Sequence, residues 1–167
     1  MSLDEITTRL PSRIAFLLGF AALRLAIALA IAWAFGVTLF FPKGYVAGFI
    51  YERADLIRAH VDFLMMAQFL LVFVILFKQY EITPPRWIIL FCCRGAFFNP
   101  VGFLRRGLTP KIVPAPIVEP HFPLRAAVSF SLITIGFLVS VGLVAAAPWR
   151  ARTSTRPAGA PATFDRA

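Results

Sequence analysis

The sequence has few charged residues for its length. Only 15% of its 167 residues are Asp, Glu, Lys or Arg, whereas 59% are hydrophobic, and the mean hydropathy is +0.79. About a quarter of the residues in an ordinary soluble domain are charged. A soluble fold of this size could not hide so many apolar side chains, because much of its surface must face water. The composition therefore excludes an ordinary soluble domain and indicates a lipid environment.

Cysteine is scarce as well, and the motifs of common soluble enzymes are missing. The two cysteines, Cys92 and Cys93, are adjacent and lie inside an apolar run. Neighbouring cysteines rarely satisfy disulfide geometry, and their spacing does not match a zinc site. The sequence has no glycine-rich phosphate loop after a strand, no G-x-S-x-G and no H-E-x-x-H. We interpret both cysteines as packing residues.

Four long apolar runs predict an all-α integral membrane bundle of four transmembrane helices. The runs cover about residues 14–40, 59–77, 85–104 and 124–147, and a span needs roughly 20 residues. Residues 51–58 are predicted as a short interfacial helix. Pro148 is predicted to stop the fourth helix, so residues 1–147 form the membrane domain and residues 148–167 a disordered basic tail. An even number of spans places both termini on one side.

The net charge of +9 comes from basic residues that flank the apolar runs. This placement fits anionic lipid headgroups and not a nucleic-acid surface. Basic residues are almost equally divided between the two predicted sides, so the positive-inside rule gives no orientation. The predicted partner is the lipid bilayer, and nucleic acid is excluded.

Three charged residues lie within the predicted spans: Arg24, Asp62 and Arg94. Charges at membrane depth usually face a protein interior or a cavity. One interpretation is a charged pocket built from all three residues. The other is a structural ion pair, together with an arginine that extends to a lipid headgroup.

His60, at the start of the second run, is the first candidate ligand. A histidine that enters an apolar bundle, with the small Ala67 on the same helix face, could ligate a porphyrin iron. Arg53 and Arg58 lie close by in sequence, where they could pair with haem propionates. The alternative is an interfacial histidine bonded to a headgroup or loop. His121, the other histidine, lies in a proline-rich loop predicted on the same side as His60.

Asn99, which precedes Pro100 in the third run, also has two interpretations. Its side chain could satisfy the backbone groups that the proline frees. It could instead extend into a substrate cavity.

Parts of residues 58–109 resemble the styrene-oxide isomerases, small bacterial membrane proteins with four helices and a haem b between subunits. The similar segments are Arg58-Ala59-His60, Met65-Met66, Asn99 with Gly102-Phe103, and Arg106-Gly107-Leu108-Thr109, preceded by Pro42-Lys43-Gly44-Tyr45. In that family an asparagine follows the histidine by a little under two turns, and a tyrosine follows the glycine-phenylalanine pair. This chain has neither residue.

The resemblance implies a homo-oligomer of the bacterial inner membrane that binds haem b through the histidine matching His60. Ferric haem is then a Lewis acid that opens a small hydrophobic epoxide to an aldehyde. Arg53 and Arg58 become cofactor-binding residues, and Asn99 a catalytic residue. Two other functions remain open. A non-catalytic haem protein is favoured if His60 and His121 both bind iron, and a cofactor-free accessory or transporter subunit is favoured if the protein is colourless.

Overall fold

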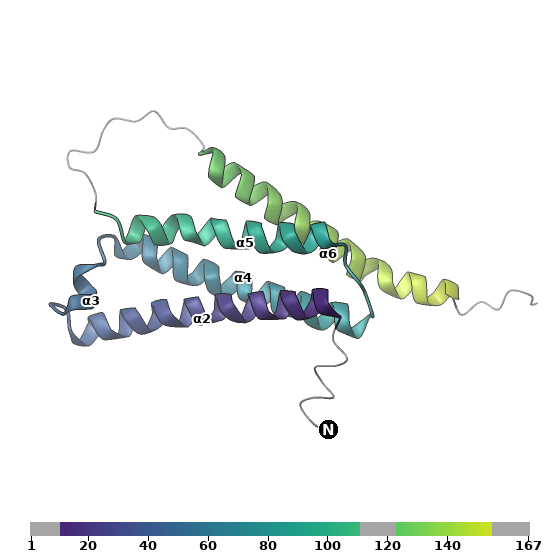
Figure 1. The fold of residues 1–167 in the computed structure, drawn as a ribbon, viewed down its shortest axis with the longest axis horizontal. Helices are drawn as coiled ribbons and strands as arrows, with labels where there is room; N and C mark the ends of the chain where they lie inside the picture. The colour runs from purple at the N-terminus through teal and green to yellow at the C-terminus, as the bar shows by residue number, and fades with distance from the viewer. Residues whose placement is uncertain (1–10, 111–122, 155–167) are drawn as a thin grey trace, which may run out of the picture.

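The structure, a computed structural model, describes residues 11–110 and 123–154, and these ranges contain helices and no strand. The helices are α2 (Ser12–Phe40), α3 (Tyr45–Gly48), α4 (Arg53–Gln79), α5 (Arg86–Gly107) and α6 (Leu124–Ser154), as Figure 1 shows. The predicted all-α fold is confirmed.

The four long helices lie side by side in the order in which they occur along the chain. α2 packs on α4, α4 on α5, and α5 on α6, and each pair is antiparallel (Figure 1). Within the described ranges α6 touches α4 slightly and does not contact α2. The bundle is therefore an open row, and α6 is held almost entirely by α5.

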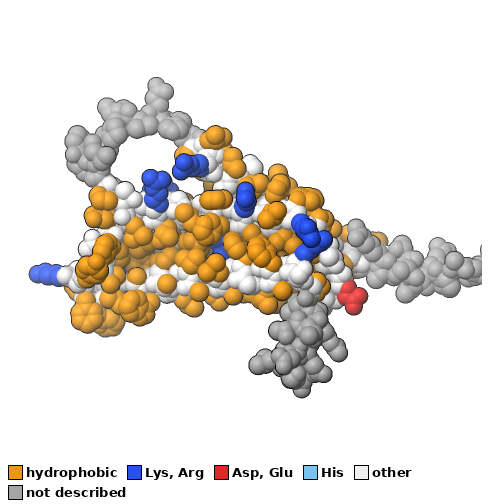
Figure 2. Space-filling view, viewed as in Figure 1, with side chains coloured by type: hydrophobic (Ala, Val, Ile, Leu, Met, Phe, Trp, Pro, Cys, Tyr) orange, Lys and Arg blue, Asp and Glu red, His pale blue; other side chains and the backbone are white. Residues whose placement is uncertain are grey.

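Each long helix is long and apolar enough to cross a membrane. Figure 2 shows hydrophobic side chains over most of one face of the molecule. A surface of this kind suits lipid and not water. The chain is accordingly a multi-pass helical membrane protein.

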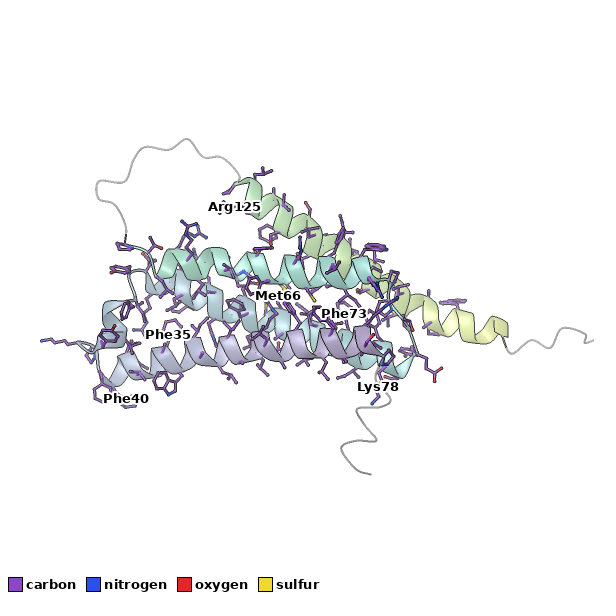
Figure 3. All side chains as sticks on the ribbon, in the orientation of Figure 1. Phe35, Phe40, Met66, Phe73, Lys78 and Arg125 are labelled. Atoms are coloured by element: carbon purple, nitrogen blue, oxygen red, sulfur yellow. The ribbon has the colours of Figure 1, made fainter. Side chains whose placement is uncertain are left out.

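Backbone and side-chain contacts hold the helix ends together on both sides of the bundle. At one end, Arg13 donates from Nη1 to the carbonyl oxygen of Pro84, 3.1 Å away, in the α4–α5 connection. At the other end, the backbone N–H groups of Tyr51 and Glu52 donate to the carbonyl oxygen of Gly107 at 3.0 and 3.1 Å. Figure 3 shows Phe40 and Lys78 at these two opposite ends.

Small residues set the spacing between neighbouring helices. Ala28 on α2 and Ala59 on α4 are fully buried, and small residues allow close helix approach in membranes. At the α5–α6 crossing, a Cβ added to Gly95 would lie 2.7 Å from the Cα of Ile133. Ser129 on α6 donates to the carbonyl oxygen of Gly95 at 3.0 Å. The last helix is thus seated directly on the backbone of α5.

The predicted interfacial helix over residues 51–58 is wrong. The short helix is α3, at Tyr45–Gly48, whereas residues 53–58 form the first turns of α4. No glycine or proline occurs between residues 53 and 79, so nothing interrupts the helix at the predicted boundary.

The predicted stop at Pro148 is also not found, because α6 continues through Pro148 to Ser154. Proline removes one backbone donor and favours a kink, which a membrane helix tolerates better than a soluble one. The rest of the predicted tail, residues 155–167, lies outside the described residues.

Candidate functional site

His60 lies in the third turn of α4, on the flank that faces α2. Its Nδ1 is 2.9 Å from the backbone carbonyl oxygen of Ala28. A carbonyl oxygen only accepts, so Nδ1 must carry the proton and donate it. In the neutral ring the lone pair is then on Nε2. Metal-binding histidines usually have this arrangement, in which one ring nitrogen is anchored and the other is left to coordinate.

The two predicted arginine partners lie on different flanks of α4. Arg53 is two helical turns before His60 and so shares its flank. The guanidinium of Arg53 lies 5.5 Å from the ring centre of Phe35 on α2. Arg58 is two residues from His60, and residues at that spacing do not face each other on a helix.

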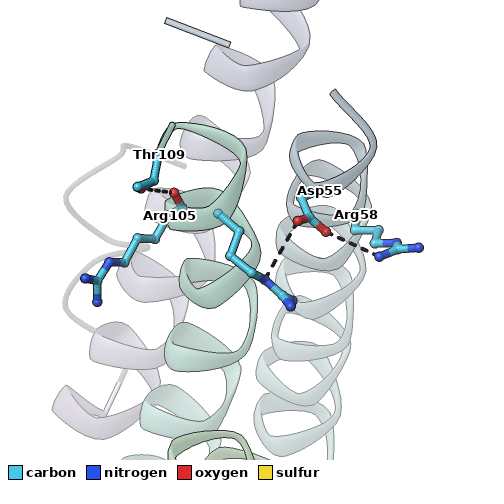
Figure 4. Close-up of polar contacts among 5 residues, drawn as sticks. Asp55, Arg58, Arg105 and Thr109 are labelled. Carbon is cyan, nitrogen blue, oxygen red and sulfur yellow. Dashed lines mark hydrogen bonds and ion pairs between the residues drawn. The ribbon is translucent and has the colours of Figure 1, made fainter. Parts of the chain in front are cut away.

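Arg58 belongs instead to a cluster of charges at the α4–α5 end of the bundle (Figure 4). Its Nη1 lies 3.3 Å from one carboxylate oxygen of Asp55, and Nε of Arg106 lies 3.8 Å from the other oxygen. The carboxylate thus joins α4 to α5. Arg53, and not Arg58, therefore shares the flank of His60.

Asn99 donates from Nδ2 to a carboxylate oxygen of Asp62 across the α4–α5 interface. Its side chain is therefore committed to the neighbouring helix and not to the backbone freed by Pro100. Two polar pairs join α4 to α5, Asp62 with Asn99 and Asp55 with Arg106. On each helix the two residues are seven apart, as expected for antiparallel helices in a regular register.

A groove of about 380 Å³ opens beside this pair on the outer surface of α4 and α5. Ile57, Val61, Met65 and Phe103 form its apolar walls, and Arg58, Asp62 and Asn99 are its polar members. Concave sites for small molecules commonly combine apolar walls with a few placed polar groups. The groove could therefore hold a small hydrophobic molecule that carries a polar atom.

Arg24 lies behind Asp62, inside the bundle. Its side chain is 0% exposed, and none of its three guanidinium nitrogens has a hydrogen-bond partner among the described residues. The guanidinium carbon is 4.9 Å from the ring centre of Phe63 and 6.0 Å from that of Phe20. Asp62 interacts with Arg24 electrostatically. The nearby charge and the two ring faces are the stabilising surroundings of this cation.

The structure brings together only part of the predicted set. Arg24 and Asp62 share one interior region, whereas Arg94 is exposed on the outside of α5. The predicted pocket of three charges is therefore reduced to two. The pairing of Asp62 with Asn99 was missed, although both are polar residues at matching heights of adjacent antiparallel helices. His121 lies outside the described residues.

His60 and Asn99 border opposite sides of the exposed face of α4. His60 faces α2, whereas Asp62, two residues further on, faces α5 and holds Asn99. Exposed Ile57 and Val61 lie between these two flanks. One copy of the chain therefore does not place His60 and Asn99 in a common cavity.

In comparisons with known proteins, no family model, curated protein or solved structure matches the chain.

Proposed function

We propose that the chain is a bacterial inner-membrane protein that binds haem b through His60 and isomerises a small hydrophobic epoxide to an aldehyde. The observation that supports this most directly is the bond from His60 Nδ1 to the carbonyl oxygen of Ala28. It fixes the tautomer and directs the lone pair to Nε2, as an iron ligand requires.

Of the two arginines predicted to bind the cofactor, only Arg53 is suitably placed. Arg53 shares the flank of His60 and is exposed, so its guanidinium is available for a haem propionate. Arg58 is bound to Asp55 on the other flank, so it does not serve the same haem within one copy. The exposed Ile57 and Val61 offer an apolar surface beside His60.

Haem b, when bound, supplies a Lewis acid that withdraws electrons from an epoxide oxygen. The bond to Ala28 holds the ring of His60 in one tautomer, and the apolar walls of the groove suit a hydrophobic molecule. Asn99 supplies an amide that can hydrogen-bond to a polar atom in the groove. Because His60 and Asn99 lie on opposite flanks of α4, a second copy of the chain completes the site in a homo-oligomer.

The test is the absorption spectrum of detergent-purified protein from haem-supplied cells. We expect a Soret band in the wild type, its loss in His60→Ala, and its retention in His121→Ala, the matched control at the other histidine. Removal of His60 also removes the bond to Ala28 and could disturb folding. Added imidazole distinguishes the two effects, because it should restore the band in a folded His60→Ala variant that lacks only the iron ligand.

Three outcomes would contradict the proposal in different ways. Loss of the band in both variants would indicate a six-coordinate haem carrier without an open position for a substrate. A colourless wild type would favour a cofactor-free accessory or transporter subunit. A haem-loaded protein that converts none of a series of small hydrophobic epoxides to an aldehyde would support haem binding and contradict the isomerase activity.

A further inference from the structure

The amide of Asn99 can present two different patterns of hydrogen-bonding groups to the groove. With Nδ2 toward Asp62, one N–H is committed and the carbonyl oxygen and second N–H remain. With the amide flipped, the oxygen is committed and both N–H groups remain. An ionised carboxylate is an acceptor only, so it selects the first orientation. A protonated carboxyl group can donate and would permit the second.

Burial disfavours the ionised form of Asp62, whereas the charge of Arg24 and the hydrogen bond from Asn99 favour it. Its side chain is buried, and Arg24 supplies the opposite charge from the interior of the bundle. Arg24 has no hydrogen-bond partner of its own among the described residues, so it acts on Asp62 through charge. A buried cation at membrane depth is costly, and a nearby carboxylate offsets part of that cost.

We infer that Asp62 is a positioning residue, which fixes the amide of Asn99 in one orientation and so sets the donor and acceptor pattern of the groove. Arg24 has a supporting role, because its charge favours the ionised carboxylate and opposes the effect of burial. The polar series then runs from Arg24 in the interior, through Asp62, to Asn99 at the groove wall. The inference rests on the proposed function in one respect, which is that a bound substrate forms a hydrogen bond with the amide of Asn99.

The sequence offers a direct probe, because Asn99 is the only asparagine in the chain. Asparagine labelled with ¹⁵N at Nδ2 alone therefore gives a single side-chain amide signal. We expect its two protons to be widely separated in the spectrum of the wild type, since one donates to a carboxylate. The separation should decrease in Asp62→Leu, which removes the carboxylate, keeps a similar size and adds no second asparagine. It should also decrease in Arg24→Met.

The matched control is Asp55→Leu, which changes the other buried carboxylate of α4 that faces α5. It should leave the Asn99 signal unchanged, because Asp55 is bound to Arg58 and Arg106. An unchanged separation in Asp62→Leu would overturn the inference. So would an equal decrease in Asp55→Leu, which would indicate a general loosening of the α4–α5 interface.

A measurement on the wild type avoids dependence on variants that fail to fold. Protein with ¹⁵N at Asn99 Nδ2 and ¹³C at the aspartate carboxyls, placed in lipid bilayers, should show strong dipolar dephasing between the two labels. Absence of dephasing would also overturn the inference. Neither experiment needs haem or substrate. If the isomerase activity is missing while both signals are found, the proposed function fails and the positioning role of Asp62 stands.

Discussion

Arg24 lies in the middle of α2, with its guanidinium fully buried against the rings of Phe20 and Phe63. Interactions of a cation with aromatic faces contribute about 2 kcal/mol when water is excluded. The desolvation of a buried cation costs several kcal/mol, which exceeds that contribution. The charge of Asp62 is therefore required as the second stabilising influence, and the two residues should be energetically coupled.

We expect Arg24→Met to destabilise the folded protein by about 3 kcal/mol, because it leaves Asp62 buried without an opposite charge. Asp62→Asn should also destabilise it. The double variant should be more stable than the sum of the two losses predicts, with a coupling energy of at least about 1 kcal/mol. Reversible unfolding of the four proteins in mixed detergent micelles measures this coupling. Simple additivity would show that the two charges act independently.

At this scale the sequence identified which residues were unusual but not which of them meet. Arg24, Asp62, Arg94, His60 and Asn99 all stand out because polar groups at membrane depth are costly. Whether each faces a neighbour or lipid depends on the rotation of its helix, which weak amphipathic patterns leave undetermined. Arg94 was consequently grouped with Arg24, although it lies on the outside of α5.

Helices α5 and α6 approach each other closely at two glycines, Gly95 on α5 and Gly136 on α6, which have no side chain to separate the helices. A Cβ on Gly136 would lie 2.9 Å from the backbone nitrogen of Cys92, just as one on Gly95 would collide with Ile133. The obstructing atoms include backbone atoms at both glycines, which cannot rotate away as a side chain can. The contact should therefore be intolerant of even one added methyl group.

We expect Gly95→Ala to destabilise the protein by about 1–3 kcal/mol, because it forces α5 and α6 apart. Gly142→Ala is the matched control, since that glycine is also in a membrane helix and no atom lies within 4 Å of the added Cβ. It should be neutral or slightly stabilising. Unfolding in detergent compares the two variants, and faster maleimide labelling of Cys92 in Gly95→Ala would report the separation directly. Equal stability of both variants would contradict a close contact between α5 and α6 at Gly95.

The helices themselves were predictable because their apolar lengths match a bilayer, and the errors occurred at their ends. The start of α4 was placed too late because Arg53, Asp55 and Arg58 resemble a polar loop. In the structure Asp55 neutralises part of that charge by bonding to two arginines. The sequence predicts that α6 ends at Pro148, because proline interrupts helices in soluble proteins. In the structure α6 continues to Ser154.

Four antiparallel spans determine which connections share a side of the membrane. Ser12 at the start of α2 and Thr83 between α4 and α5 belong to one end of the bundle. Thr109, after α5, belongs to the other end, where its hydroxyl caps the carbonyl oxygen of Arg105 at 2.6 Å (Figure 4). All three residues are exposed.

Single cysteines at these positions should therefore give two labelling classes with a membrane-impermeant maleimide. Ser12→Cys and Thr83→Cys should react from the same side, and Thr109→Cys from the opposite side. The native Cys92 and Cys93 are buried, so the unmodified protein is the control and should label weakly. Reaction of Ser12→Cys and Thr83→Cys from opposite sides would remove a span from the topology.

Because neighbours in space are also neighbours along the chain, the order of synthesis matches the order of assembly. Each helix that leaves the ribosome finds its main partner already in the bilayer, so no long-range pairing has to wait for a distant segment. The bonds from His60 to Ala28 and from Asn99 to Asp62 join α2, α4 and α5 only. A nascent chain can therefore form both before α6 has been translated.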